Sequence, residues 1–124
     1  MSERTPFPND EILVDGAVGA SPSEALARDA VLVDVRRRAA RRESGQGLAG
    51  APYRDPEAFD AADPLWRGDA EVLVFCVHGH EVSQGVCAKL RAAGIPARYV
   101  VGGLDGLTAA GAALTDLPSD EGEK

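Results

Sequence analysis

Apolar residues along the chain form three short runs, separated by stretches that mix polar and apolar positions. The runs are AVLVDV (30–35), EVLVF (71–75) and ARYVV (97–101). Short runs rich in branched apolar residues are typical of strands that are buried on both faces, as in a parallel sheet. We therefore predict three parallel strands at these positions.

The segments between these runs carry helix signals. A capping box at residues 21–24, with Pro22 at the first helical position, predicts a helix over 22–28. Apolar spacing predicts a second helix over 83–94, with Gly94 as its stop. Shorter helices are predicted over 37–44, 55–62 and 104–110, a loop over 45–47 and an extended piece over 50–53.

Alternating strands and helices indicate the α/β class, with a central, mostly parallel β-sheet and helices on both of its faces. The 124 residues suit one domain. We expect that domain over residues 21–117, after a partly extended N-terminal segment (1–20). The acidic tail (118–124) is predicted to be frayed.

Charge and composition narrow the function. The net charge of −7 disfavours nucleic-acid binding. Neither a leader-like N-terminus nor an apolar run long enough for a membrane span is found, so we expect no membrane association. Cys76 and Cys87 do not form a secreted disulfide framework, which makes the cytoplasm the expected location. The basic segment 36–42 is read either as a solvated helix face or as the source of an anion-binding arginine.

Cys76 stands where the second apolar run ends, close to His78 and His80. Ligands of parallel sheets bind beyond the carboxyl ends of the strands, which is where this cysteine is expected. A zinc site is disfavoured because these residues supply three ligands and structural zinc takes four. A small buried cysteine is the reading that we prefer for Cys87, in the predicted helix.

For Cys76 the pattern favours a nucleophile. A loop that runs from a strand into a helix N-terminus gathers backbone N–H groups, which bind anions and favour a thiolate. Gly79 allows that loop to turn with positive φ.

Three motifs together resemble the rhodanese family of sulfurtransferases. They are VLVDVR (31–36), VLVFCVHGHEVSQG (72–85) and YVVGGLDGLTAAGAAL (99–114). They match the family's D-V-R strand end, its Cys-x-x-Gly loop and its G-G-x-x-x-W segment. The likeness spans about residues 21–117 and is greatest to single-domain sulfurtransferases. A looser likeness is to rhodanese-like proteins associated with chromate resistance.

The resemblance implies a thiosulfate sulfurtransferase-like enzyme without a metal or organic cofactor. Cys76 would take a sulfane sulfur from thiosulfate or a persulfide donor and pass it to a thiophilic acceptor. Asp34 and Arg36 would be structural residues near the site. The implied partners are small anions or thiols, or a protein that donates or accepts sulfur. The implied substrate-binding loop contains Val77, His78, Gly79, His80, Glu81 and Val82.

The chain departs from the family in three places. Leu107 replaces the usual Trp, and QGLAGA (46–51) lacks the family's His and Pro. The cysteine loop is one residue longer than usual, as in related phosphatases and arsenate reductases, but Val82 stands where those proteins have an anion-binding Arg. Glu81 adds negative charge, so we expect thiosulfate to be a weak donor.

Several alternatives stay open at this point. The chain could be a non-catalytic, regulatory rhodanese-like module, or it could handle oxyanions such as arsenate or chromate through Cys76. The two histidines could contact the substrate anion or simply be exposed. Cys87 could act as a resolving thiol instead of a core residue.

Overall fold

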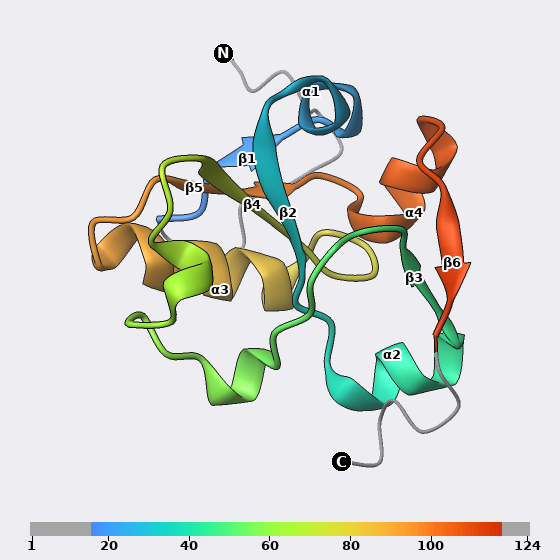
Figure 1. Cartoon of the computed structure of the whole chain (residues 1–124), viewed down its shortest axis with the longest axis horizontal. Coiled ribbons are helices and arrows are strands. Elements are labelled where there is room, and N and C mark those ends of the chain that lie inside the picture. Colours follow the sequence, from blue (N-terminus) through green and yellow to red (C-terminus); the bar gives the residue numbers. More distant parts are fainter. Residues whose placement is uncertain (1–15, 118–124) are drawn as a thin grey trace.

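A parallel four-stranded sheet runs through the middle of the molecule (Figure 1). The structure, a computed structural model, describes residues 16–117, so the predicted acidic tail lies outside the described residues. The strands lie in the order β1 (Gly19–Ala20), β5 (Ala97–Val100), β4 (Glu71–Phe75) and β2 (Ala30–Asp34). The three strands predicted from apolar runs are therefore confirmed, and they are neighbours. β1 adds a short edge strand from the segment that we placed before the domain.

Both faces of the sheet are buried, because residues within each strand alternate between two apolar clusters. Val72 and Val74 of β4 pack on the side of helix α3 (Glu81–Ala92). Leu73 and Phe75 pack on the other side, beneath α1 (Pro22–Ala27) and α4 (Gly103–Ala109). This explains why β4 reads as a continuous apolar run instead of an alternating one.

The helix predictions at the two ends of the domain are confirmed, with small shifts. Ser21 and Glu24 form the capping box in α1, each backbone N–H bonded to the other's side chain at 3.1 Å. Helix α2 spans Arg38–Ser44, and α4 begins at Gly103. Leu107, the departure from the family's Trp, is fully buried in α4 and keeps an apolar plug there.

A second, two-stranded antiparallel sheet was not predicted. Strand β3 (Gln46–Leu48) lies where the sequence predicted a loop, and it pairs with β6 (Leu114–Asp116). The prediction was wrong because the partner strand lies far along the chain, and local pattern carries no sign of such pairing.

The predicted helix over 55–62 was also wrong. Two 3₁₀ turns occur instead, η1 (Pro56–Ala58) and η2 (Pro64–Trp66), each capped by the aspartate before its proline. The chain is extended at Phe59, whose ring lies 6.0 Å from the Trp66 ring. Packing of these two rings beside the core ends the first turn early.

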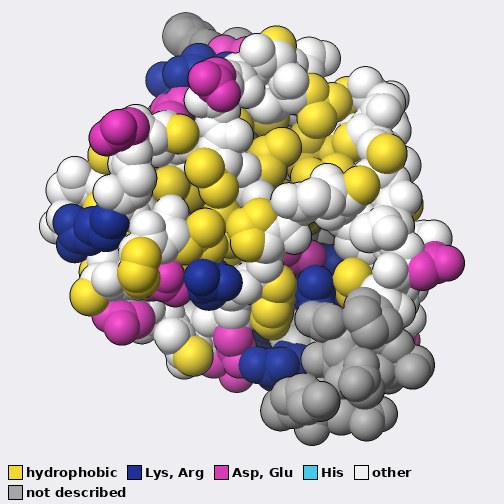
Figure 2. Space-filling model, in the orientation of Figure 1, with side chains coloured by type: hydrophobic (Ala, Val, Ile, Leu, Met, Phe, Trp, Pro, Cys, Tyr) yellow, Lys and Arg dark blue, Asp and Glu magenta, His cyan; other side chains and the backbone are white. Residues whose placement is uncertain are grey.

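The outer edge of β2 is hydrogen-bonded near its carboxyl end, where the Asp34 backbone N–H donates to Pro52 O and its C=O accepts from Arg54 N–H. Figure 2 shows hydrophobic side chains gathered over the central part of this face, where β2 lies. Within the described residues, no helix is long and apolar enough to cross a bilayer.

Candidate active site around Cys76

Cys76 follows β4 directly and lies at the floor of a hollow. Its side chain is 6 % exposed, so it is sheltered but can be reached. The hollow measures about 260 Å³ and lies between the cysteine loop, the first turn of α3 and the start of α2. Its remaining lining residues are Arg36, Arg37, Ala40, Val77, His78, His80, Glu81 and Val82.

The cysteine loop is shorter than the sequence predicted. Helix α3 begins at Glu81 and not near Ser83, so only residues 77–80 separate Cys76 from the helix. Glu81 and Val82, which we assigned to the loop, form its first turn. A carboxylate is favourable at a helix N-terminus, which explains why the helix extends back to Glu81.

Gly79 makes the tight turn of this loop possible. Its φ is +79°, and a Cβ there would lie 2.6 Å from both Gly102 N and Val100 O. No side chain fits that space. The positive φ predicted from the sequence is confirmed, and the close contact with the strand end of β5 adds a second requirement for glycine.

The start of α4 fixes the other side of the loop. Leu104 N–H donates to Cys76 O at 2.8 Å, and Asp105 N–H donates to Val77 O at 3.3 Å. A Cβ on Gly103 would lie 2.4 Å from Cys76 O, so only glycine lets α4 approach so closely. This contact requires glycine at position 103, while Gly102 has a φ of +80°.

These bonds also orient the amides of the loop. The C=O and N–H groups of a trans peptide unit point in opposite directions, and no cis peptide bond occurs here. Because the Cys76 and Val77 carbonyls point at α4, the N–H groups of Val77 and His78 point away from it. The hollow lies on the side of α2 and α3. The loop thus directs its backbone N–H donors away from α4. On that side they are available to an anion bound to Cys76.

Two buried polar residues of α3 lie against the loop, and they were not among the predicted site residues. The Cys76 thiol donates to Ser83 Oγ at 3.1 Å, and Ser83 is fully buried. Gln84 Nε2 donates to Gly79 O at 3.2 Å and holds the turn of the loop. The available signal was the polar pair Ser83-Gln84 on the face of an amphipathic helix that otherwise packs in the core.

Asp34 and Arg36 form a buried ion pair beside the hollow. Arg36 is 1 % exposed and donates to both carboxylate oxygens, with the shortest contact at 2.7 Å. The same guanidinium donates to Gln46 O at 2.8 Å and so joins the end of β2 to β3. In the structure these two residues tie neighbouring segments together.

Solved structures with the same fold bear on this site. A rhodanese-like domain protein from Staphylococcus aureus is 19 % identical, with a TM-score of 0.64 over 77 % of this chain and 96 % of that one. A thiosulfate sulfurtransferase from Pseudomonas aeruginosa is 20 % identical, with a TM-score of 0.62 over 81 % of this chain but 19 % of that longer chain. This chain has the rhodanese-like fold.

A further solved structure with a similar fold carries a different description. A protein of unknown function from Rhodopseudomonas palustris, described as a possible tyrosine phosphatase, is 18 % identical, with a TM-score of 0.66 over 80 % of this chain and 85 % of that one. Neither a protein-family sequence profile nor a curated protein matches the chain. At these identities the likeness shows the fold alone.

In this rhodanese-like fold the basic segment divides into buried and exposed arginines. Arg41 contacts Asp34 at 3.2 Å and lies over the Tyr53 ring at 4.3 Å. Arg37 is largely exposed, its Nε 3.7 Å from a Glu57 carboxylate oxygen, and it lines the hollow of Cys76. Arg37 is therefore the arginine of this segment that lies exposed at the site, a distinction that the sequence did not reveal.

The two histidines lie at the mouth of the hollow. His78 and His80 are both exposed, with ring centroids 6.4 Å apart. His78 Nδ1 lies 3.1 Å from Asp105 Oδ2 of α4, an exposed pair that contributes little to stability. Within residues 16–117, no group of three or more His, Cys, Asp or Glu side chains is placed to hold a metal ion.

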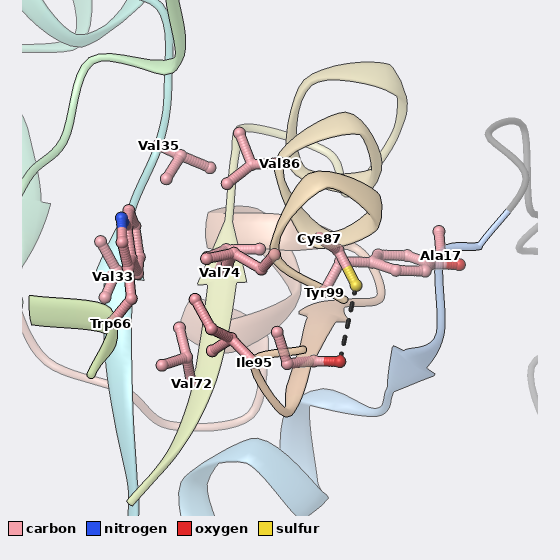
Figure 3. Packing of buried hydrophobic residues seen from close by; sticks show 12 residues of the cluster. Ala17, Val33, Val35, Trp66, Val72, Val74, Val86, Cys87, Ile95 and Tyr99 are labelled. Carbon is pink, nitrogen blue, oxygen red and sulfur yellow. Dashed lines mark hydrogen bonds between the residues drawn. The ribbon is translucent and has the colours of Figure 1, made fainter. Parts of the chain in front are cut away.

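Cys87 lies in the core of the rhodanese-like fold, as its preferred reading predicted (Figure 3). It is fully buried among apolar residues, and its thiol faces the carbonyl oxygens of Ala97 at 3.6 Å and Val18 at 3.8 Å. Burial raises the pKa of this thiol. Both cysteines are free thiols.

Proposed function

We propose that the protein is a sulfurtransferase that carries a sulfane sulfur on Cys76 as a persulfide. The observation that carries this proposal is the placement of the Cys76 sulfur. It lies at the floor of an open hollow, 3.1 Å from the buried Ser83 hydroxyl and just before the N-terminus of α3. Each of these surroundings stabilises a sulfur anion.

Sulfur enters by nucleophilic substitution. The Cys76 thiolate attacks the outer sulfur of thiosulfate, the new S–S bond forms, and the bond to the sulfonate sulfur breaks. Sulfite leaves with the electron pair of that bond, and Cys76 keeps a persulfide with one negative charge. No external oxidant or reductant is required, because the outer sulfur only changes its partner.

Sulfur leaves by the reverse type of step. Cyanide or a thiolate attacks the outer sulfur of the persulfide, and Cys76 departs as a thiolate while thiocyanate or a new persulfide is released. The Ser83 hydroxyl can donate to the sulfur anion in each state, and the amides of Val77 and His78 face away from α4 and are available to an anion on Cys76. The groups that hold the charge therefore need not rearrange between the two half-reactions.

Charge around the hollow favours a donor with a single negative charge over thiosulfate. Glu81 lines the hollow, whereas the Arg36 guanidinium beside it is already paired with Asp34 and the exposed Arg37 lies 3.7 Å from the Glu57 carboxylate. Thiosulfate carries two negative charges and meets the Glu81 carboxylate at the entrance. A persulfide anion carries one charge at its reactive end, so we propose a persulfide as the better donor.

A phosphatase reading is less well supported by the same hollow. A phosphate dianion needs strong compensation, commonly from an arginine with two parallel hydrogen bonds. Here the first turn of α3 offers Glu81 and Val82 in the positions closest to the loop. This charge pattern argues against a phosphate ester as the substrate, although a protein of similar fold has been described as a possible tyrosine phosphatase.

Transfer of sulfur from thiosulfate to cyanide tests the proposal, with the Cys76→Ser variant as comparison. We expect thiocyanate formation by the wild type and a loss of about 1,000-fold or more in the variant, because the nucleophile is removed. A persulfide donor and p-nitrophenyl phosphate are assayed in parallel. Equal rates in both proteins, or turnover of the phosphate ester in place of sulfur transfer, would overturn the proposal. Failure of Cys76 to hold sulfur from any donor would indicate a non-catalytic module.

A further inference from the structure

A second, larger hollow adjoins that of Cys76. It measures about 480 Å³ and lies between η1 and α3. Arg37, Glu81 and Val82 line both hollows, so the two are neighbours that share these residues. A volume of this size is typical of a small-molecule site.

Charged groups of both signs surround this hollow. Lys89 and Arg37 supply positive charge, while Glu57 and Glu81 supply negative charge. The Arg37–Glu57 contact is long, at 3.7 Å, and the two side chains are 62 % and 75 % exposed. Such a pair is loosely held, so each group can turn to a ligand.

Apolar side chains also line the hollow, and a gap lies among them. Phe59, Val82 and Val86 line it, and Lys89 Nζ lies 5.7 Å from the centre of the Phe59 ring. Gly85 lies on α3 among them, and a Cβ placed there would meet nothing within 4 Å. Glycine is unfavourable inside a helix, and here it leaves open the space that a side chain would fill.

We propose that this second hollow, called the groove below, holds the body of a small thiol acceptor. The acceptor carries both carboxylate and ammonium groups, and its sulfur reaches Cys76. This inference rests on the proposed sulfur transfer. Carboxylates of the acceptor would bind Lys89 and Arg37, and its ammonium group would bind Glu57 or Glu81. An inorganic anion or an uncharged thiol would match only some of the charged and apolar residues that line the groove.

The chemical step is balanced without an added oxidant. The acceptor thiolate attacks the outer sulfur of the Cys76 persulfide, and an S–S bond forms on the acceptor. The bond between that sulfur and Cys76 Sγ breaks, and its electron pair returns to Cys76 as a thiolate. The acceptor leaves as a persulfide anion, and the charge is conserved.

Filling the gap at Gly85 tests the groove. The Gly85→Leu variant is compared with Gly68→Leu, because Gly68 also has open space around its Cβ position but lies in a loop outside both hollows. The acceptors are glutathione, which carries charges of both signs, 2-mercaptoethanol, which carries neither, and cyanide. We expect the ratio of kcat/KM for glutathione to that for cyanide to fall at least tenfold in Gly85→Leu, through KM. The Gly68→Leu variant should keep the wild-type ratio.

A charge variant supplies a second readout. Lys89→Gln should raise KM for glutathione about threefold to tenfold without the same change for 2-mercaptoethanol, and Lys89→Arg should restore it. Unchanged ratios in both Gly85→Leu and Lys89→Gln would overturn the groove assignment. The mass of wild-type protein after donor treatment separates this result from a failure of the proposed function, since sulfur on Cys76 shows that the transfer chemistry is intact.

Discussion

The two cysteines of this chain are both buried, yet their surroundings differ completely. Cys76 precedes the N-terminus of α3, and its sulfur faces the Ser83 hydroxyl and an open hollow. Cys87 lies within the same helix, and its sulfur faces backbone carbonyls inside an apolar cluster. The exposed fractions, 6 % and 0 %, barely separate them. What decides the chemistry of a thiol here is the set of groups that can stabilise its anion.

The loop that surrounds Cys76 depends on a glycine, and replacing it should produce the largest loss. In Gly79→Ala the new Cβ would meet backbone atoms at 2.6 Å, and φ is +79°. We expect the free energy of unfolding to fall by about 3 kcal/mol or more, because strain and overpacking add. Urea unfolding measures this change.

Gly50→Ala separates the two causes in that prediction. Gly50 has nearly the same φ, +82°, but a Cβ there meets nothing within 4 Å. In Gly50→Ala the free energy of unfolding should fall by about 1–2 kcal/mol, which is the cost of the left-handed conformation alone. Equal losses in the two variants would show that the close approach of Gly79 to Gly102 has no energetic importance.

Ser83→Ala and Cys87→Ala should differ in the rate of sulfur transfer. Removing a hydrogen bond to a charged group costs about 1.5–3 kcal/mol, so Ser83→Ala should lower sulfur transfer by about tenfold to 100-fold. Cys87→Ala removes the core sulfur and should leave kcat/KM within about twofold, since its contacts lie in the core. If Cys87→Ala lost more activity than Ser83→Ala, the assignment of roles to the two cysteines would be wrong.

Glu81 tests the charge of the Cys76 hollow. Glu81→Gln removes one negative charge from its lining, and against the two charges of thiosulfate at about 6 Å in water this is worth about 1.4 kcal/mol, or about tenfold in KM for thiosulfate. Glu43→Gln makes the same change of net charge at an exposed position outside the hollow. We expect KM for thiosulfate to fall only in Glu81→Gln, and the difference to shrink in high salt.

Stability at high pH should depend on the Cys87 thiol. Burial raises the pKa of Cys87 above its usual 9.0. The folded state then holds this proton more tightly than the unfolded state, so the stability it contributes is complete below about pH 9 and falls as pH rises through the folded pKa, by up to about 1.4 kcal/mol per pH unit. Cys87→Ala should lose less stability than the wild type between about pH 8 and pH 10. Parallel urea curves for both proteins check this, and identical losses would contradict it. The raised pKa of Tyr53 acts in both proteins and cancels in the comparison.

The sequence pattern predicted those helices and strands that depend on residues close together in the chain. The apolar runs of β2, β4 and β5 and the capping box of α1 required only neighbours in sequence. The pairing of β3 with β6 joins segments far apart in the chain, so no local signal indicated it. The extended residue Phe59 likewise depends on its packing near Trp66.

The same limit applies to the site. Cys76 and Gly79 were predicted because a strand end and a turn residue can be read from the sequence. The hydrogen bond of Ser83, the contact of Gly103 with the loop and the exposure of Arg37 arise from packing of separate elements. A hydroxyl on a helix becomes a partner of the sulfur only when the helix docks on the sheet.

The central claim is that Cys76, and not Cys87, carries sulfur, and peptide mass after treatment with a sulfur donor tests it most directly. Cleavage after Glu71 and Glu81 places Cys76 in the peptide 72–81 and Cys87 in another, whereas cleavage after Lys and Arg leaves both in one. We predict a gain of one sulfur atom on peptide 72–81 that disappears when cyanide is added. Sulfur on the Cys87 peptide, or on neither peptide with any donor, would contradict the account.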